Sequence, residues 1–563
     1  MSTTEFSVRT RAADLADAAA QEVDVLVVGM GATGAGVALD AASRGLRVAV
    51  VDQGDVASGT SSKSSKLVHG GLRYLENYEF GLVREGVTER QTLMRLAPHL
   101  VRPMEFLYPV WPDTPKRRLL GLGLTTYDVF ALAMLGGSGV RRHERITAEE
   151  AVALAPALAR SGLTHSYLYG DCATDDARLV LAVVQAARSF GALAVPYAEV
   201  TGLLSSDGRV RGATVRDRVS GRDVELRARH VVNATGVWVD RLQALESPGR
   251  PAVVQPSKGV HVVVPHARLP LREASVLLPS RQGDGRSMFA IPYGEQTILG
   301  TTDTPYDGAL EDLSLTGADL EYVLAAGNDV FRAGLVPDDV LGAWAGVRPL
   351  IREHGATSMK DVSRRHTLVE GEGGLLTITG GKLTTYRRMA KDVVDRVVAR
   401  DGRRARCRTD EIPLGSTRPV EQVRAEVLPA AAALALDERV ALGLVRQVGE
   451  RAHEVLGLVA ADPSLGQLLS PSAPHIAAEV VHAARAEGAV TLDDVLSRRM
   501  RLSLRAKDAG LPAAPLAARL LAAETGHDDA WATAQVAAYA EAVRRERGVL
   551  GLGGVMSELA AAG

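Results

Sequence analysis

The sequence predicts an α/β fold that begins with a βαβ unit and ends in an all-helical region. Three observations support this prediction: a glycine fingerprint between two short apolar runs, further strand-like runs up to about residue 410, and a composition richer in Ala, Leu, Arg and Glu after Pro413. The chain has 563 residues, and a single hydrophobic core stops growing at about 250–300 residues. We therefore expect an N-terminal tail over 1–22, a mixed α/β part over 23–410 and a helical C-terminal domain over 411–563.

The βαβ unit opens with Val23–Val28, an apolar β-branched run typical of a buried parallel strand. Gly29, Gly31 and Gly34 follow at once and lead into a run of small residues with helical character. In such a fingerprint the first glycine permits a tight turn, the second lets a pyrophosphate approach the backbone, and the third lets helix and strand pack closely. Asp52 ends the next apolar run, about 20 residues on, where an acid can bind a ribose hydroxyl. The unit therefore predicts a dinucleotide site rather than an ordinary glycine-rich turn.

Two further segments rich in Gly and Thr follow strand-like runs. Asn233–Gly236 comes after a run that is preceded by a strand–turn–strand pattern, and ITGGKLTT occupies residues 378–385 before a helix. Ligands bind where the carboxyl ends of parallel strands meet, so these segments and the fingerprint can converge on one cofactor.

Composition excludes several classes of protein. Hydrophobic residues make up 46% and charged residues 23%, which is globular rather than disordered. Lys plus Arg (65) nearly balances Asp plus Glu (67), so we expect no nucleic-acid partner. The N-terminus lacks the pattern of a secretory signal, and only two cysteines occur, neither in a CxxC motif. We expect a reducing, cytoplasmic compartment and no metal site of the Cys/His type.

Residues 59–76, GTSSKSSKLVHGGLRYLE, are dense in hydroxyls, glycines and cations. A helix or strand core does not need this composition, whereas a phosphate-binding or active-site loop does. Here the sequence resembles the FAD-dependent glycerol-3-phosphate dehydrogenase family of the bacterial aerobic and mitochondrial type. The resemblance covers nearly the whole chain, in order, through VVGMGATGAG, this loop, YGD, VVNATGVWVD, PSKGVH, FAIPY, LGTTDT, AGVRPL, SRRH, ITGGKLTTYR and LDDVLSRRMRL.

The resemblance implies a FAD-binding Rossmann-type domain, interleaved with an antiparallel-sheet substrate domain, and a C-terminal helical domain. It implies oxidation of sn-glycerol 3-phosphate to dihydroxyacetone phosphate by hydride transfer from C2 to N5 of FAD. It also implies that electrons pass to a membrane quinone from an enzyme that is peripheral on the inner face of the cell membrane. A homodimer is compatible with the family, although no motif in the sequence supports one.

The cofactor contacts expected from the resemblance lie in the fingerprint, the hydroxyl-rich loop and the strand ends. They are Gly29, Gly31, Ala32, Thr33, Gly34, Asp52, Gly59, Thr60, Ser61, Ser62, Ser64, Ser65, Lys66, Leu67, Val200, Ala234, Thr235, Gly236, Gly381, Lys382, Leu383 and Thr384. Met30 replaces a glycine common in the family and should point away from the pyrophosphate. Asp52 stands where the family usually shows Glu, so it must come closer to the ribose or bond through water.

The substrate phosphate favours Arg forks and Lys point charges. Cations in matching motifs are Arg73, Arg348 and Lys382, and Arg348 is expected to hold the phosphate or the C2 oxygen. The full set of expected substrate contacts is Arg73, Tyr74, Lys258, Arg348, Lys382 and Thr384.

A histidine is expected to take the hydroxyl proton, because its unperturbed pKa of about 6.5 lies near working pH. The preferred base is His261, in the motif GVHVVVP. The second candidate is His69, in VHGG, as a base or a substrate ligand, and His366, in SRRH, is a weaker candidate. The alternatives are a hydrogen-bonded strand histidine for His261 and a loop-forming residue that supports the flavin for His69. Val260 stands where the family commonly has Ser, which removes any hydroxyl contribution there.

Residues 115–124, PKRRLLGLGL, place basic residues beside an apolar run. This pattern suits an interfacial helix on a membrane, and equally a buried helix with a charged N-terminal flank. The longer stretch 119–137 carries Thr, Tyr and Asp and is a weak candidate for a membrane-spanning helix.

Two other functions stay open. An oxygen-using glycerol-3-phosphate oxidase would share the flavin and substrate motifs, but no long insertion separates Asp303 from Trp344, which favours the dehydrogenase. A non-catalytic, redox-sensing flavoprotein would need FAD but not the Arg, Lys and His set.

Overall fold

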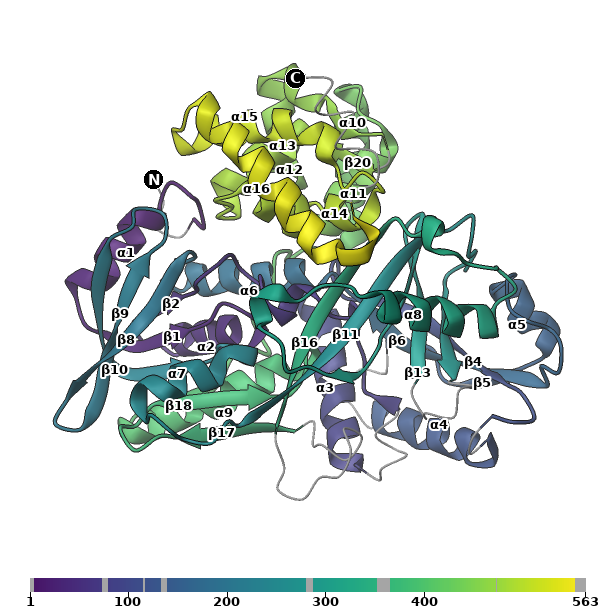
Figure 1. The fold of residues 1–563 in the computed structure, drawn as a ribbon, viewed down its shortest axis with the longest axis horizontal. Coiled ribbons are helices and arrows are strands. Elements are labelled where there is room, and N and C mark those ends of the chain that lie inside the picture. Colours follow the sequence, from purple (N-terminus) through teal and green to yellow (C-terminus); the bar gives the residue numbers. More distant parts are fainter. Residues whose placement is uncertain are drawn as a thin grey trace.

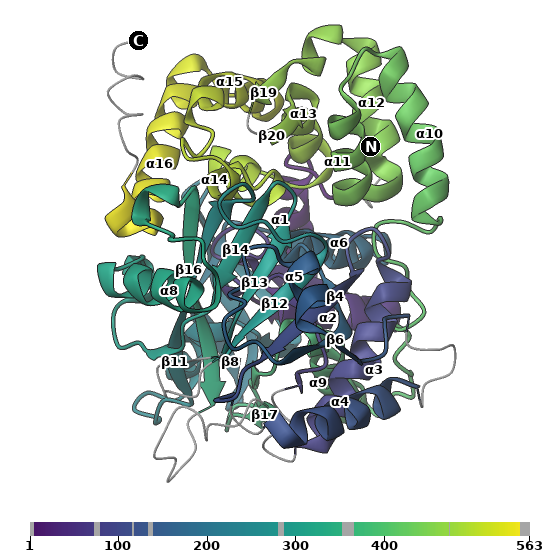
Figure 2. The same ribbon diagram turned by 90° about the vertical axis from the view of Figure 1, so that its right-hand side faces the viewer.

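The computed structural model describes residues 5–72, 79–114, 117–132, 139–279, 287–351, 365–471 and 473–551. Two β-sheets with their helices form the body of the molecule, and a helical domain covers one end of it (Figures 1 and 2). The α/β fold with mixed sheets and a C-terminal helical domain is thereby confirmed.

The first sheet is built around the predicted βαβ unit, in which β1 pairs in parallel with both β2 and β10. Its strands, in spatial order, are β17 (His366–Glu370), β18 (Leu376–Gly380), β10 (Asp223–Asn233), β1 (Val23–Val28), β2 (Val48–Val51) and β7 (Leu193–Val195). The strand–turn–strand pattern is also confirmed, because β8 (Ala198–Ser206) and β9 (Arg209–Asp217) extend from β10 as an antiparallel meander.

Both faces of this sheet are covered, which explains the unbroken apolar sequence of β1 and β2. One face packs against the helices α2 (Ala32–Ser43), α6 (Asp176–Ser189) and α9 (Tyr386–Arg400). The other face packs against β8, β9, α7 (Val239–Glu246) and α1 (Arg11–Ala20).

The stretch 1–22, expected to be an N-terminal tail, contains the helix α1. Leu15 and Ala18 are buried against the sheet. The guanidinium of Arg11 donates to the carbonyl oxygens of Pro196 and Tyr197 and to the carboxylate of Asp217. This stretch therefore packs as part of the α/β body.

The second sheet is largely antiparallel and is interleaved with the first in sequence, since β3–β6 lie between β2 and β7, and β11–β16 between β10 and β17. Its strands are β3 (Leu67–Val68), β4 (Arg102–Val110), β5 (Glu144–Ile146), β6 (His165–Ala173), β11 (Val254–Pro265), β12 (Ala274–Pro279), β13 (Ser287–Tyr293), β14 (Gln296–Gly300), β15 (Thr304–Pro305) and β16 (Gly342–Ile351). Its accompanying helices are α3 (Phe80–Leu96), α4 (Arg117–Leu132), α5 (Ala148–Leu154) and α8 (Gly317–Val330).

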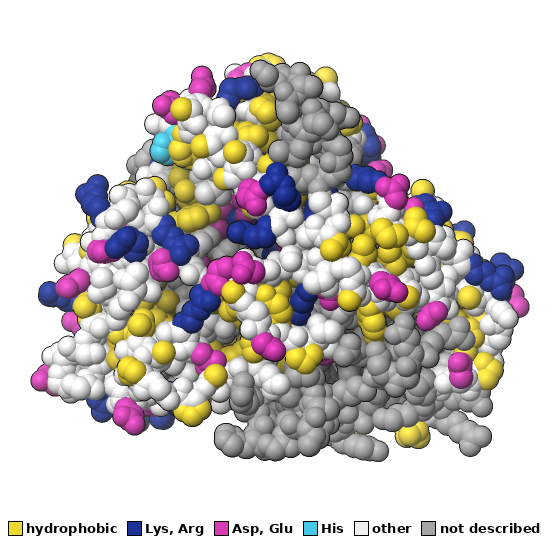
Figure 3. Space-filling model, viewed as in Figure 1, with side chains coloured by type: hydrophobic (Ala, Val, Ile, Leu, Met, Phe, Trp, Pro, Cys, Tyr) yellow, Lys and Arg dark blue, Asp and Glu magenta, His cyan; other side chains and the backbone are white. Residues whose placement is uncertain are grey.

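The C-terminal domain is helical apart from a short hairpin of β19 (Leu468–Ser470) and β20 (Ala473–Ile476). Its helices are α10 (Val420–Ala433), α11 (Glu438–Val448), α12 (Ala452–Ala461), α13 (Ala477–Ala486), α14 (Leu502–Arg505), α15 (Ala514–Thr525) and α16 (Asp529–Arg547). This domain and α4 lie at opposite ends of the molecule (Figures 1 and 2). Charged side chains of both signs are interspersed over the face in Figure 3.

Candidate active site

Each of the three fingerprint glycines is needed for a different structural reason. Gly29 adopts φ +106°, and a Cβ there would collide with the carbonyl group of Ala234. A Cβ on Gly34 would overlap the carbonyl oxygen of Gly29, so this position must stay small for α2 to pack on β1. At Gly31 a Cβ would meet only the Ser61 side chain, with Oγ at 3.0 Å, and the space beyond it is open. Gly31 therefore leaves room for a ligand, whereas Gly29 and Gly34 serve the fold.

A cavity of about 380 Å³ lies beyond these glycines. The ends of β1, β10 and β18 converge on it, as the Gly/Thr-rich segments predicted. The expected cofactor residues that line it are Gly29, Gly31, Ala32, Thr33, Asp52, Gly59, Thr60, Ser61, Ser64, Val200, Ala234, Thr235, Gly236, Gly381, Lys382 and Leu383. The start of α2 is in this set. The Ala32 amide donates to Ser61 Oγ at 2.9 Å, and the other amides of the first turn can bind phosphate oxygens.

Asp52 is held at the cavity wall by the backbone. Its Oδ2 accepts a hydrogen bond from the Met30 amide at 2.6 Å, and its Oδ1 accepts one from the Gly54 amide at 2.9 Å. Burial raises the pKa of the Asp52 carboxyl to about 6, against the lowering effect of these two amides. The side chain of Met30 is buried in the core beneath, away from the cavity as expected.

A second cavity of about 560 Å³ adjoins the first and shares with it Thr60, Ser64 and residues 380–383. One part of its wall is polar and includes His69, His261, Thr301, Asp303 and Arg348. Another part is apolar and comes from α4 and the second sheet: Leu119, Leu120, Leu122, Phe106, Leu277 and Phe289. The shared residues make the two cavities parts of one site.

His261 lies on β11 at the polar wall, with only 2% of the residue exposed. Its ring stacks on Trp344 of β16, with centroids 4.7 Å apart, and its Nε2 lies 2.8 Å from the Ser65 hydroxyl. Burial, followed by the charges of Arg348 and Lys66, lowers the pKa of His261 well below its usual value. The imidazole is therefore neutral at physiological pH and holds a lone pair.

Arg348 lies on β16, and its guanidinium covers Gly259 of β11, where a Cβ would collide with it. Its Nη2 donates to Thr301 Oγ1 at 2.9 Å, and its Nη1 lies 3.3 Å from Asp303 Oδ1. The motifs PSKGVH, LGTTDT and AGVRPL are thus brought together, and they place a cation and a neutral imidazole on one wall.

His69 and Lys382 also line this cavity. The backbone amide of His69 donates to Thr384 Oγ1 at 3.2 Å, so the VHGG and GGKLT motifs meet beside the site. Ser65, Leu67 and Thr384, which we expected at the cofactor, line this larger cavity as well.

Several expected residues do not line either cavity. Lys258 is buried on the other side of β11 from His261, and its Nζ donates to Asp319 of α8 at 2.6 Å, which corrects its assignment to the substrate. Lys66 is buried in an ion pair with Asp176, so its contribution is to the loop rather than to the cofactor.

His366 and Ser62 lie away from both cavities. His366, the weaker base candidate, is hydrogen-bonded to Asp392 at 2.8 Å and does not line the cavities. Ser62 is buried beneath the loop and does not line them either. Arg73 and Tyr74 lie outside the described residues.

Sequence reasoning missed part of the lining. Trp238, Arg241 and Met389 line the smaller cavity. Tyr169 and Asp171 line the larger one. Trp238 stands in VVNATGVWVD, and Tyr169 and Asp171 in YGD, so the motifs did carry the signal.

Comparison with known proteins identifies the class. The sequence model described as FAD dependent oxidoreductase matches residues 24–387, and that described as the C-terminal domain of alpha-glycerophosphate oxidase matches residues 407–532. The chain is thus an FAD-dependent oxidoreductase, and the open position at Gly31 with the convergent strand ends fits that cofactor.

Comparison with individual proteins identifies the family within this class. Glycerol-3-phosphate dehydrogenase 2 of Mycobacterium bovis is 39% identical over 529 residues, which cover 93% of this chain and 89% of that protein. The mitochondrial glycerol-3-phosphate dehydrogenase of Homo sapiens is 34% identical over 541 residues, covering 90% and 71%. The FAD-complexed glycerol-3-phosphate dehydrogenase from Bacillus halodurans has a TM-score of 0.80 at 28% identity, covering 96% and 98%. The chain belongs to the FAD-dependent glycerol-3-phosphate dehydrogenase family.

Proposed function

We propose that the enzyme oxidises sn-glycerol 3-phosphate to dihydroxyacetone phosphate. The names of the relatives indicate this substrate. The observation that carries the proposal is the larger cavity, where neutral His261 and cationic Arg348 share a wall beside the FAD cradle. A non-catalytic flavoprotein would not need this pair.

FAD, held by the residues of the smaller cavity, would supply the acceptor for the hydride of C2. Arg348 and Lys382 attract the anionic phosphate or the C2 oxygen, since both line the cavity. Because the Ser65 hydroxyl lies 2.8 Å from His261 Nε2, the proton of the C2 hydroxyl passes through Ser65: Ser65 Oγ gives its own proton to Nε2 and takes that of the substrate, while Nδ1 keeps the ring's other proton. Stacking on Trp344 fixes the plane of the imidazole. His69 is proposed as a substrate ligand on the same wall.

We further propose that the electrons pass to a membrane quinone, with the enzyme bound peripherally at the inner face of the cell membrane. Leu119, Leu122 and Phe80 are 58%, 67% and 45% exposed and also line the rim of the larger cavity. An exposed apolar cluster of this kind favours contact with a membrane or another surface. Leu124 and Tyr127 on the same helix are buried, so α4 is amphipathic and not wholly buried.

The basic flank of α4 remains a sequence-based expectation. Pro115 and Lys116 lie outside the described residues, and the side chains of Arg117 and Arg118 do so too. Among the described residues, none of the helices combines the length and the apolar character that a membrane crossing needs.

Anaerobic mixing of the FAD-loaded enzyme with sn-glycerol 3-phosphate tests the proposed function. We expect the flavin absorbance to bleach with this substrate and not with glycerol, which lacks the phosphate that Arg348 and Lys382 would hold. An unbleached flavin at high substrate concentration would overturn the proposal. Reoxidation of the reduced enzyme by a quinone analogue, faster than by air, is expected of a dehydrogenase; the reverse order would identify an oxidase.

A further inference from the structure

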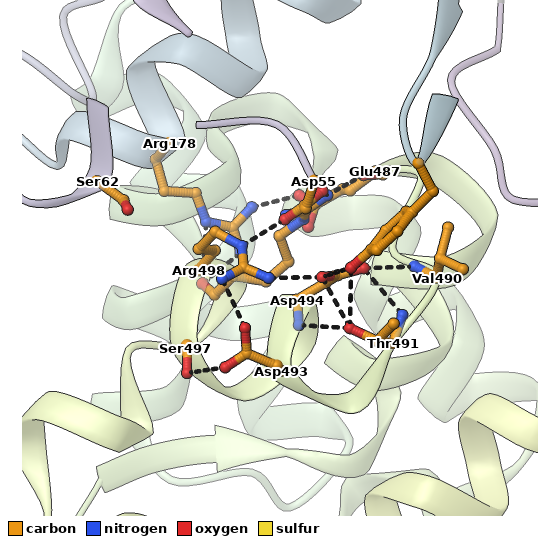
Figure 4. Close-up of polar contacts among 12 residues, drawn as sticks. Asp55, Ser62, Arg178, Glu487, Val490, Thr491, Asp493, Asp494, Ser497 and Arg498 are labelled. Atoms are coloured by element: carbon orange, nitrogen blue, oxygen red, sulfur yellow. Dashed lines mark hydrogen bonds and ion pairs between the residues drawn. The ribbon is translucent and has the colours of Figure 1, made fainter. Parts of the chain in front are cut away.

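The helical C-terminal domain reaches the active-site loops through three arginines close together in the chain. Arg498 and Arg499 both bind the buried carboxylate of Asp55, which lies in the loop after Asp52. Figure 4 shows Arg498 between Asp55 of the body and Asp493 and Asp494 of its own domain. The same figure shows Arg178 of α6 beside Glu487, a second contact between the domains.

Arg501 makes a different contact from its neighbours. Its Nη2 lies 2.6 Å from Asp175 Oδ1 and 2.5 Å from Asp176 Oδ1, at the start of α6. The side chain of Arg501 is 4% exposed and that of Asp176 is fully buried. A buried carboxylate needs such partners, because an unpaired charge in this position is costly.

Asp176 also holds the hydroxyl-rich loop. Its Oδ2 accepts hydrogen bonds from the Ser64 amide at 3.0 Å and from the Ser64 hydroxyl at 2.8 Å. Its Oδ1 accepts one from Lys66 Nζ at 2.9 Å. A single carboxylate thus joins Arg501 of the C-terminal domain to both residues that flank Ser65.

Two contacts lead from this loop to His261. The Ser65 hydroxyl lies 2.8 Å from His261 Nε2, and Lys66 Nζ lies 4.9 Å from the ring centre of Trp344, on which His261 stacks. Lys66 adopts φ +56°, a left-handed conformation that is uncommon for a residue other than glycine. The loop conformation therefore depends on its side-chain contacts, and the ion pair of Lys66 with Asp176 is buried.

We propose that Arg501 is a positioning residue, which acts through Asp176 on the loop 64–66 and so holds Ser65 against His261. This inference rests on the proposed role of His261 as the base. The separate links of Arg498 and Arg499 to Asp55, and of Arg178 to Glu487, keep the two domains in contact when Arg501 is changed. Displacement of a reacting group by 1 Å costs about 10²-fold in rate, so a shift of the loop alone has a measurable effect.

A double-mutant cycle on the FAD-loaded enzyme tests the proposal. Arg501→Gln should slow anaerobic flavin reduction by about 10- to 100-fold and leave the substrate Kd unchanged. Ser65→Ala should slow it similarly. In the Ser65→Ala background, Arg501→Gln should have little further effect, because both changes act on the same contact. Arg501→Lys keeps the charge and should restore part of the rate.

A second readout does not depend on catalysis. Amide hydrogen exchange of residues 59–68 should be faster in Arg501→Gln than in the parent enzyme, with or without FAD. The matched control is Arg485→Gln, since Arg485 is 44% exposed and pairs with Glu524 within the C-terminal domain. It should change neither the exchange of the loop nor the rate.

The proposal would be overturned if the rate losses of Arg501→Gln and Ser65→Ala multiply in the double variant. Unchanged amide hydrogen exchange of the loop in Arg501→Gln would overturn it too. If Arg501→Gln does not fold, Arg501→Lys replaces it, because Lys keeps the positive charge beside Asp176 but lacks the guanidinium that binds Asp175 and Asp176 together; the same cycle with Ser65→Ala then decides. His261→Ala distinguishes failure of the proposed base from failure of the positioning role of Arg501. A parental rate in His261→Ala would refute the proposed base, whereas a slow His261→Ala with independent effects of Arg501 and Ser65 would refute only the positioning role.

Discussion

Gly31→Val separates cofactor binding from folding. Gly31 has φ −77° and ψ −176°, which valine adopts without strain, and its Cβ would meet only the Ser61 side chain, whose Oγ accepts a hydrogen bond from the Ala32 amide at 2.9 Å. The added methyl groups would therefore project into the 380 Å³ cavity, where the cofactor's phosphates approach the start of α2. Loss of two charge-assisted hydrogen bonds, at about 1.5–3 kcal/mol each, gives about 3–6 kcal/mol, or a 10²- to 10⁴-fold higher FAD Kd.

Gly34→Ala is the matched control, because its Cβ would overlap the carbonyl oxygen of Gly29 inside the α2–β1 packing. It should lower the melting temperature of the apoprotein by more than Gly31→Val does. The assays are the flavin-to-protein absorbance ratio after purification, FAD titration of the apoprotein by fluorescence, and thermal unfolding without FAD. Parental FAD affinity in Gly31→Val, or an apoprotein as destabilised as Gly34→Ala, would refute this reasoning.

Three other variants test separate parts of the site. Asp52→Ala should raise the FAD Kd while some FAD is retained, since one hydrogen bond is worth about 0.5–3 kcal/mol; an unchanged Kd in the same titration would contradict a ribose contact. Arg348→Ala should raise KM more than it lowers kcat, and it should reduce the preference for sn-glycerol 3-phosphate over glycerol. Steady-state assays with both substrates measure these changes. An equal fall in kcat and kcat/KM would instead mean that Arg348 acts only in the transition state. Leu119→Ser with Leu122→Ser should move the enzyme from vesicles of anionic lipid into the supernatant; unchanged sedimentation would exclude α4 as the membrane contact.

The parts of the fold that depend on residues close together in the sequence could be predicted. The β1–α2–β2 unit depends on an apolar run, three glycines and an acid within about 30 residues, so spacing alone was enough. The Gly/Thr-rich segments follow strand-like runs, which predicted that they meet at one site, and the ends of β1, β10 and β18 do converge there. The packing of α1 on the sheet was not predicted, because its buried apolar residues, Leu15 and Ala18, are too few to distinguish a packed helix from a free helical tail.

The roles of individual cations were less predictable. Lys258 and Lys382 both stand in motifs shared with the family, but Lys258 points to the opposite face of β11 and pairs with Asp319. Lys66 pairs with Asp176, and Asp176 in turn pairs with Arg501. These partners are far apart in the chain, so only the tertiary structure shows which cations are already neutralised and which face the cavity.

His261 is proposed as the base beside the flavin. The measurement that tests it is anaerobic stopped-flow flavin reduction by sn-glycerol 3-phosphate, compared across pH between the parent enzyme and His261→Ala. Burial, Arg348 and Lys66 lower the pKa of His261, and the ring accepts a proton only when neutral. The parent rate should therefore stay constant down to pH 6.5 and fall only in more acidic solution. His261→Ala should be slower by about 10²–10⁴ and lose this acid limb. A parental rate in His261→Ala, or an acid limb above pH 6.5 in the parent, would contradict the assignment, and His69 would then be changed next.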